Sequence, residues 1–393
     1  MLRQMAALLA VALGGAAGPL GAPAADVAFR GVDIQTEWGV VYAVRVADVN
    51  ADGRPDVVAI NPTQLAWFEN PSWRRHVVVD GVLPKDHVTI AAEDVDGDGR
   101  PEIAVGAGWN PRNTTSGGEL FLATRAEPSG RQPWTVRPLG AEPTLHRIGW
   151  ATAGGRRVLV VTPLHGRGTA PPQWEGAGAR IHTLTPATNP GGAWTTEVVD
   201  DTRHILHNFL AVDFDGRPGD ELVTASREGL TLMTRSAGGT WSARLLVTAA
   251  PGEVALGRVG GRRVFGTIEP WHGSSVVCHV ESPAGWERVV LDDTIAGGHA
   301  VAWADFDADG DDELVAGWRE APYGLARYRV DASGRLASRQ LIDAGIAVED
   351  VAVADLDGDG RPDLVAAGRA TGNIRILFNQ PAAAGAKPGA TPR

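Results

Sequence analysis

The chain has 393 residues, a formal net charge of −11 and a single cysteine, Cys278. One cysteine excludes an intrachain disulfide, and an acidic chain without a basic tract lacks the usual electrostatic basis for binding nucleic acid. Thirteen tryptophans and 50 glycines are typical of a β-protein with many tight turns.

The first 25 residues have the pattern of a secretory signal peptide. Arg3 precedes an apolar run from Met5 to Leu13, and small residues follow as far as Ala25. We predict cleavage after residue 25 and a secreted or periplasmic protein. A membrane anchor is the alternative, although the apolar run is short for a bilayer, and we expect no membrane span in the rest of the chain.

The stretch from Asp355 to Asp363 reads D-x-D-x-D-G-x-x-D. Carboxylates at this spacing wrap a hard cation such as Ca²⁺, and the glycine permits the turn that brings the last carboxylate back to the ion. The flanking residues 352–354 and 364–367 are short apolar runs, which predict buried strands rather than the helices of an EF-hand. We therefore expect a structural calcium loop between two strands; a solvated acidic turn is the alternative.

This unit recurs along the chain at a spacing that suggests propeller blades. The predicted calcium ligands are Asp48, Asn50, Asp52, Asp56; Asp94, Asp96, Asp98, Glu102; Asp305, Asp307, Asp309, Glu313; and Asp355, Asp357, Asp359, Asp363. A damaged copy has Asp213, Asp215 and Glu221, with Arg217 at its third ligand position. We hypothesise that the Arg217 guanidinium group takes the place of the ion there and pairs with one of these carboxylates.

Two further units have a Gly-Gly pair, at 154–155 and at 260–261, where the others have the Asp loop. Because such a pair suits a two-residue hairpin, the first two strands of each unit should be antiparallel neighbours. Most units continue with a third strand and a fourth that contains a tryptophan. We expect these tryptophans to pack in the core: Trp73, Trp134, Trp194, Trp241 and Trp286.

Four antiparallel strands in each of seven units predict an all-β fold, a seven-bladed β-propeller with calcium-binding D-x-D-x-D-G loops, over residues 26–380. The last unit ends at Ile374–Phe378 without a fourth strand, and Val27–Val32 is predicted to supply it. Residues 381–393 are rich in Pro, Ala and Gly and are predicted to form a disordered tail.

The first strands of a propeller line its channel, so their starting residues converge on the channel mouth. These residues are polar in all seven units: Tyr42, His87 (one position out of register), His146, His207, Glu253, His299 and Glu349. Imidazole and carboxylate groups together suit Zn²⁺ or another borderline divalent metal. A hydrogen-bonded network that plugs the channel is the alternative.

The second strands are expected to end on the same face. Arg227, Arg319 and Arg369 occupy one register there, Glu269 replaces them in the fifth unit, and His165 and His272 follow just beyond. Arginine forks bind carboxylates well, although blade-to-blade ion pairs are an alternative role. Trp109 and Trp318 are candidates to offer flat apolar faces to a sugar ring.

The Asp-loop units resemble FG-GAP or VCBS repeats, a resemblance that implies the propeller fold and says little about function. A narrower resemblance lies in residues 145–148, 161–166, 268–273 and 298–300, which read LHRI, VTPLHG, IEPWHG and GHA. These segments are similar to the propeller of aldos-2-ulose dehydratases, which are metal-dependent sugar lyases.

That resemblance implies β-elimination from a keto-sugar or a uronate-containing glycan, with a divalent metal polarising the group beside the acidic C–H. It implies metal ligation by His146, His207 and His299, with Glu349 or His87 as a further ligand. Proton transfer would fall to His165, His272, Tyr42 and Glu253, and the substrate would be oriented by Arg147, Arg227, Arg319 and Arg369. A non-catalytic glycan- or protein-binding propeller is the alternative, and the oligomeric state stays open.

Overall fold

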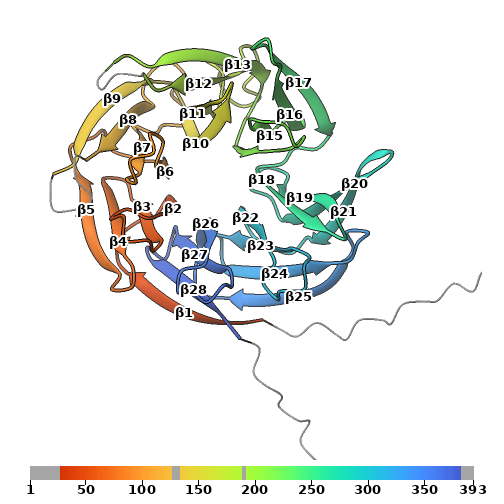
Figure 1. Ribbon diagram of the computed structural model, residues 1–393. Coiled ribbons are helices and arrows are strands. Elements are labelled where there is room, and N and C mark those ends of the chain that lie inside the picture. Colours follow the sequence, from red (N-terminus) through yellow and green to blue (C-terminus); the bar gives the residue numbers. More distant parts are fainter. Residues whose placement is uncertain (1–26, 126–132, 188–191, 382–393) are drawn as a thin grey trace, which may run out of the picture.

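The computed structural model describes residues 27–125, 133–187 and 192–381. These residues form seven antiparallel four-stranded sheets around a central channel (Figure 1), and the described ranges contain no helix. The prediction of an all-β, seven-bladed propeller is therefore confirmed. We number the blades 1 to 7 in chain order from β2.

Each blade runs outward from the channel through four strands. The innermost strands are β2 (Ala43–Ala47), β6 (Thr89–Glu93), β10 (Leu145–Ala153), β14 (Asn208–Val212), β18 (Glu253–Val259), β22 (Gly298–Ala304) and β26 (Val348–Ala354). The second strands are β3 (Asp56–Ile60), β7 (Glu102–Ala107), β11 (Arg156–Pro163), β15 (Glu221–Ser226), β19 (Arg262–Glu269), β23 (Glu313–Trp318) and β27 (Asp363–Gly368).

The outer half of each blade is built in the same way. The third strands are β4 (Gln64–Glu69), β8 (Glu119–Thr124), β12 (Ala179–Thr185), β16 (Gly229–Arg235), β20 (Ser275–Ser282), β24 (Gly324–Val330) and β28 (Ile374–Gln380). The outermost strands are β5 (Arg74–Asp80), β9 (Thr135–Ala141), β13 (Thr195–Arg203), β17 (Trp241–Val247), β21 (Gly285–Asp292), β25 (Leu336–Asp343) and, for blade 7, β1 (Ala28–Gln35).

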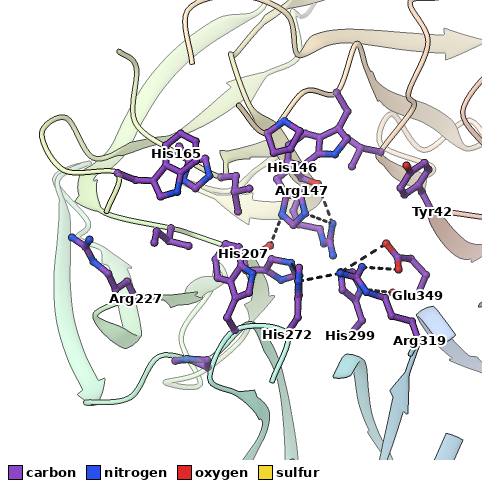
Figure 2. Close-up of a pocket in the computed structure, with 18 of the residues that line it drawn as sticks. Tyr42, His146, Arg147, His165, His207, Arg227, His272, His299, Arg319 and Glu349 are labelled. Atoms are coloured by element: carbon purple, nitrogen blue, oxygen red, sulfur yellow. Dashed lines mark hydrogen bonds and ion pairs between the residues drawn. The ribbon is translucent and has the colours of Figure 1, made fainter. Parts of the chain in front are cut away.

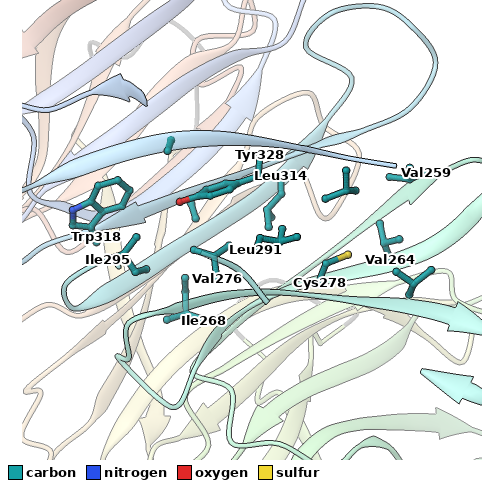
Figure 3. Packing of buried hydrophobic residues seen from close by; sticks show 14 residues of the cluster. Val259, Val264, Ile268, Val276, Cys278, Leu291, Ile295, Leu314, Trp318 and Tyr328 are labelled. Atoms are coloured by element: carbon teal, nitrogen blue, oxygen red, sulfur yellow. The ribbon is translucent and has the colours of Figure 1, made fainter. Parts of the chain in front are cut away.

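The hydrophobic core is divided into seven clusters, one between each pair of neighbouring blades. The second strands are buried on both faces, which is why they read as continuous apolar runs instead of alternating ones. Figure 3 shows the cluster between blades 5 and 6, where Val276 and Cys278 of β20 face Leu314 and Tyr328. Burial raises the pKa of the Cys278 thiol to about 12, so this cysteine behaves as a small apolar residue.

The tryptophans of the outer strands belong to these same clusters, as predicted. Each one packs, half-buried, against the interface between its own blade and the preceding blade. Trp73 of blade 1, for example, lies against the cluster shared with blade 7, and Trp286 of blade 5 lies against the cluster shared with blade 4.

The ring is closed by strands from both ends of the chain, which confirms the predicted role of residues 27–32. In Figure 1 the red strand β1 lies beside the blue strand β28, and Ala28 pairs with Gln380 at one end of this ladder. Arg375 adds an ion pair, in which its Nη2 donates to Asp33 Oδ2 at 2.7 Å. Blade 7 therefore joins residues that are more than 300 positions apart in the sequence.

Two predicted segments cannot be compared with the structure. The signal peptide, residues 1–25, and all but the first residue of the predicted tail, 381–393, lie outside the described residues. Among the residues that are described, no helix is long and apolar enough to cross a membrane.

The Asp loops join the first strand of a blade to its second strand, and they share one geometry. The first aspartate accepts hydrogen bonds from the backbone N–H groups four and five residues later, as in Asp355 with Asp359 (3.1 Å) and Gly360 (2.9 Å). Gly360 has φ +85°, a left-handed conformation that a side chain would disfavour. The complete loops of blades 2, 6 and 7 therefore bring three carboxylates close together, and calcium binding itself stays a prediction.

The last carboxylate of each loop is buried, or half-buried in the case of Glu102, and closes the loop. Asp363 accepts from the backbone N–H of Leu356 at 2.9 Å and from that of Asn379 at 2.7 Å. Burial raises the pKa of this last carboxyl to about 6 in Asp56 and Asp363, and to about 7 in Glu102 and Glu313. A carboxyl that resists ionisation in this way would gain from a cation beside it.

In blade 6, two arginine side chains place positive charges among the carboxylates of the loop. Arg327, whose side chain is 3 % exposed, donates from Nη2 to Asp307 Oδ2 at 2.5 Å and lies 3.3 Å from Glu313. Arg329 Nη1 donates to the same Asp307 oxygen at 2.9 Å, and its Nη2 binds Asp309. In blade 2 the strand positions equivalent to these two arginines hold Leu122 and Thr124.

The hypothesis about Arg217 in blade 4 is correct for its partner and wrong for its position. Arg217 Nη1 forms an ion pair with Asp215 Oδ2 at 3.6 Å, but the side chain is 82 % exposed, so the guanidinium group does not take the place of an ion. Asp213, Asp215 and Glu221 nevertheless lie close enough together to share an ion. In blades 2 and 7 an arginine of the loop itself pairs with the third aspartate, whereas in blade 6 two arginines from the third strand stand among several of the loop carboxylates.

We expect the blade 6 loop to bind calcium more weakly than the other complete copies, because a calcium ion must displace two arginines. In the variant Arg327→Leu/Arg329→Thr, which copies blade 2, calorimetric titration should detect one more tightly bound ion per chain than in the unaltered protein. Arg335→Thr, an exposed change in the same blade, is the control. Identical titrations for all three proteins would contradict the expectation.

The same loops predict how stability should depend on pH. A carboxyl whose pKa is raised on folding stabilises the fold below its unfolded pKa, and this contribution is lost as the pH rises through the folded value. In chelator, the loop carboxyls Asp56, Glu102, Glu313 and Asp363 should therefore lose their stabilising contribution as the pH rises from 6 to 8, because they ionise beside other carboxylates. The buried histidines of the channel mouth, whose pKa values are lowered, act in the opposite direction, but they do so with and without calcium. The rise in Tm that excess calcium produces over chelator should therefore be larger at pH 8 than at pH 6, and thermal melts in both solutions would test it. A rise of equal size at the two pH values would exclude a role for these loops.

Candidate active site at the channel mouth

The starts of the first strands and the ends of the second strands meet at one end of the channel, because neighbouring strands are antiparallel. A cavity of about 560 Å³ opens there, a size typical of pockets for small organic ligands. Its lining includes all but two of the predicted transition-metal and catalytic residues: Tyr42, His146, Arg147, His165, His207, Arg227, His272, His299, Arg319, Glu349 and Arg369. The register argument thus located the cavity correctly.

Three first-strand histidines are fixed by the neighbouring blade. The Nδ1 atom of His146 lies 2.7 Å from the backbone oxygen of His207, that of His207 lies 2.9 Å from Gly252 O, and that of His299 lies 2.6 Å from Glu349 O. A carbonyl oxygen can only accept, so each Nδ1 carries the proton and each Nε2 keeps its lone pair. That tautomer is the one in which Nε2 can bind a metal ion or accept a proton.

A left-handed residue precedes these histidines in the chain. Thr144, Ile205 and Gly297, each two positions earlier, have φ of +57°, +50° and +64°. Such a conformation is ordinary for glycine and costly for a β-branched isoleucine. The backbone therefore turns sharply into the first strand and presents the histidine at the mouth.

His207, His272 and His299 form a compact group, in which one ring nitrogen from each lies within 4.8 Å of the others. The two Nε2 atoms of His207 and His272 are 2.5 Å apart, and the ring centres of His272 and His299 are 4.8 Å apart (Figure 2). His146 lies beside this group, with its ring centre 4.5 Å from that of His207, and Arg147 Nη1 donates to its Nε2 at 3.1 Å. The structure thus groups His272, instead of His146, with the other two.

Burial keeps these imidazoles neutral. It lowers the pKa of His146, His207 and His299 well below the usual 6.5, and the positive charges of Arg147 and Arg319 act in the same direction. The pKa of His272 is lowered as well, first by burial. Neutral imidazole is the form that ligates metals, so protons should not compete for this group near neutral pH.

Glu349 is held by two arginines. Arg319 Nη1 donates to Glu349 Oε2 at 2.8 Å, and Arg369 Nη1 donates to Oε1 at 2.6 Å. His299 Nε2 is 3.8 Å from Glu349 Oε1, so a metal ion could reach this carboxylate only in competition with the arginines. The alternative prediction of blade-to-blade ion pairs is therefore correct for Arg319, which joins blade 6 to blade 7.

Arg319 and Tyr42 complete this end of the cavity. The second Nη atom of Arg319 donates to His272 Nδ1 at 3.0 Å, which leaves the His272 proton on Nε2, facing His207. Tyr42 lies beside Arg369, whose guanidinium carbon is 5.4 Å from the ring centre. Burial raises the pKa of Tyr42, so the phenol keeps its proton.

The structure does not bring His87 to the cavity. Its side chain is fully buried elsewhere, and Val88 occupies the lining position in blade 2. The reason is the one-residue offset in register, because successive residues of an extended strand point to opposite faces. His87 is therefore not placed to share an ion with the other histidines.

Glu253 lies behind His207 instead of facing the cavity. It is 3 % exposed, and its Oε1 is 2.9 Å from His207 Nδ1 and 3.5 Å from Arg147 Nη2. Asn208, which sequence reasoning missed, donates to its other oxygen. Burial raises the pKa of Glu253 to about 7. A carboxyl in this position orients an imidazole and does not reach a ligand directly.

Two other expected features are corrected. Trp318 is 5 % exposed within the cluster between blades 5 and 6, and its Nε1 donates to Pro322 O at 2.6 Å, so it offers no face to a sugar. Glu269 turns into its own blade, where it is bound by His279 Nε2 at 2.7 Å and Arg288 Nε at 2.8 Å. Trp109 does line the cavity, as predicted.

Sequence reasoning missed three apolar residues of the cavity lining, Trp174, Ile205 and Trp271. Trp271 directly precedes His272, and only the histidine of that motif was predicted to line the site. Trp174 lies in the loop after β11, nine residues beyond His165, where no periodic pattern reaches. The sequence therefore predicted most of the polar residues of the cavity lining but not these apolar ones.

Comparison with known proteins agrees with the fold. The profile of the FG-GAP-like repeat matches residues 48–105 and 305–366. No curated protein sequence matches the chain. The resemblance to aldos-2-ulose dehydratases is not supported by these comparisons.

Solved propellers resemble the chain in structure and only weakly in sequence. Streptogramin B lyase has a TM-score of 0.57 at 14 % identity, covering 90 % of this chain and 98 % of its own. BBS1N, solved in complex with ARL6DN, has a TM-score of 0.55 at 15 % identity, covering 91 % and 98 %. An Agrocybe aegerita lectin that recognises non-reducing terminal N-acetylglucosamine has a TM-score of 0.50 at 12 % identity, covering 78 % and 81 %.

Relatives this distant differ in what they bind, so they support the architecture alone. Together with the repeat match and the seven closed blades, they establish what kind of protein this is: a seven-bladed β-propeller that contains FG-GAP-like repeats.

Proposed function

We propose that this protein is an exported, metal-dependent carbohydrate lyase that acts by β-elimination on an anionic sugar. The observation that carries the proposal is the group of His207, His272 and His299 beside an arginine-rich cavity wall. Export is inferred from the signal-peptide pattern of residues 1–25.

The three imidazoles suit a divalent metal such as Zn²⁺, with a further position left for substrate. Two of them already have the outer contacts typical of metal ligands, because His207 and His299 donate Nδ1–H to backbone carbonyls. To bind the metal, His272 would have to give up the hydrogen bond that its Nδ1 accepts from Arg319. A bound divalent ion would polarise a substrate carboxylate or carbonyl and so acidify the neighbouring C–H.

The charges in the cavity favour an anionic substrate over a neutral one. Five arginines line it, namely Arg112, Arg147, Arg227, Arg319 and Arg369, whereas Glu349 is the one carboxylate among the described lining residues. Arg227 is paired with a loop glutamate outside the lining, and Arg319 uses both Nη atoms, one for Glu349 and one for His272. Arg369 uses one Nη atom for Glu349 and keeps further N–H groups for a second carboxylate. A uronate therefore fits better than a neutral keto-sugar.

His146 is the residue best placed to move the proton. His146 lines the cavity, close to the imidazole group but outside it, and its Nε2 accepts a hydrogen bond from Arg147, which must move aside before that lone pair takes a proton. His146 takes the proton from the carbon next to the carboxylate, the freed electron pair forms a C=C bond, and the bond from the adjacent carbon to its oxygen breaks. The imidazolium then returns the proton to the leaving oxygen. The roles predicted for His146 and His272 are thus exchanged.

The metal assignment predicts a clear separation of binding from folding. His207→Ala and His299→Ala should lose most of an expected content of about one transition metal per chain, because each leaves an incomplete ligand shell. Both should melt close to the unaltered protein, since the blade interfaces are untouched. Metal analysis and thermal melts would measure this, with His76→Ala on the outer strand of blade 1 as the control. Full metal content in either variant would refute the assignment.

The proton-transfer assignment predicts the opposite pattern at His146. His146→Gln should keep the metal but lose elimination activity by about 10²–10⁴-fold, the usual contribution of a general base. Activity would be followed by the ultraviolet absorbance of the new C=C bond, using uronate oligosaccharides as substrates. If the metal-loaded protein binds such sugars without transforming them, the non-catalytic glycan-binding alternative replaces the lyase.

A further inference from the structure

The cavity has two chemically different ends. Figure 2 shows His165 and Arg227 at one end and Tyr42, Glu349 and Arg319 at the other, with His207 and His272 between them. The end that contains Tyr42 is rich in charge and hydrogen-bonding groups. The end that contains His165 is mainly aromatic and apolar, because Leu164 and Trp174 adjoin His165 in its lining.

His165 has an unused polar atom at the aromatic end. The residue is 4 % exposed, its backbone N–H donates to Thr144 Oγ1 at 3.0 Å, and its ring stacks on Trp174 with centres 3.7 Å apart. Its Nδ1 is buried and has no hydrogen-bond partner within the described chain. Burial lowers its pKa to about 4, so the ring is neutral. Buried polar atoms are normally paired, but this one has no accessible surface in the cavity, so a ligand reaches it only when the ring shifts.

The aromatic end is held in place by unfavourable backbone conformations and by an anchor. Trp174 and Ile205 have φ of +56° and +50°, values that non-glycine residues rarely adopt and that are often found at binding sites. Arg227 Nη1 donates to Gln173 O at 2.7 Å and to Glu175 Oε1 at 2.9 Å, on both sides of Trp174. Arg227 was expected to orient substrate, and the structure shows it fixing the tryptophan loop.

We propose that the aromatic end is a second sugar subsite, so that the substrate is at least a disaccharide and the bond broken is glycosidic. This proposal rests on the proposed function, and it specifies the leaving group. The uronate lies at the charged end, its C5–H electron pair forms the C4=C5 bond, and its C4–O bond breaks. The neighbouring sugar keeps that oxygen, takes the proton and departs from the aromatic end. A dehydratase would instead expel water from one sugar and would need no second subsite.

A flat indole ring suits the C–H face of a pyranose, and the imidazole of His165, stacked on Trp174, adds a polar ring beside it. Binding should therefore depend on the length of the sugar. The probes are galacturonate, glucuronate and mannuronate together with their three 1,4-linked dimers. For the preferred uronate, calorimetry should give a Kd about tenfold lower for the dimer than for the monomer, a typical effect of one well-packed aromatic contact.

Trp174→Ala should abolish this preference, whereas Trp174→Phe, which keeps a flat ring, should retain much of it. Trp73→Ala is the matched control, because Trp73 is also half-buried with φ +53° but lies beside the Asp loops of blades 1 and 7. His165→Gln, which keeps a polar atom at this position, should weaken dimer binding less than Trp174→Ala.

The outcomes separate this inference from the proposed function. Dimer-selective binding that depends on Trp174 supports the subsite even if no elimination occurs, in which case the lyase assignment fails alone. Elimination of water from a monomer, with Trp174→Ala behaving as Trp73→Ala, overturns the subsite and leaves a lyase. Equal affinity for monomer and dimer, or binding of none of the six sugars, also overturns it.

Discussion

Each blade buries the apolar faces of its middle strands against the two blades beside it, and the rest of the structure depends on this mutual burial. Seven separate clusters, and no single central core, hold the ring together. A blade that lost one neighbour would expose a row of buried valines and leucines, and a small four-stranded sheet cannot offset that exposure. Stability is therefore a property of the closed ring.

The candidate site uses the same dependence on neighbours. Each of His146, His207 and His299 is oriented by a backbone carbonyl of the next blade, so its tautomer is decided by a segment about 45 to 60 residues further along the chain. Glu349 likewise binds arginines from two blades. The site exists only where neighbouring blades meet, and its geometry is as rigid as the interfaces that support it.

The fold and the location of the cavity could be predicted from the sequence, because both follow from the spacing of the repeats and from the register of their strands. Asp loops and Gly-Gly turns mark the same point in successive blades, and counting back from them reaches the channel mouth. The individual contacts were less predictable. His87 is offset by one residue from the other strand starts, and this offset turns its side chain away from the cavity. Glu253 has the expected register, but it lies behind His207. Arg327 and Arg329 reach their loop from the third strand of the blade, a contact that no spacing reveals.

Closure by β1 has a consequence for the order of folding. This strand is synthesised first, yet its partner β28 comes last, so blade 7 stays incomplete until the whole propeller sequence is present. Until then, the apolar sides of blades 1 and 7 face solvent and can pair with the wrong chain. The final contact also closes the longest loop in the molecule, a step that is entropically slow compared with forming any single hairpin. Assembly of this ring should therefore be governed by its ends, although every blade between them is built from local contacts.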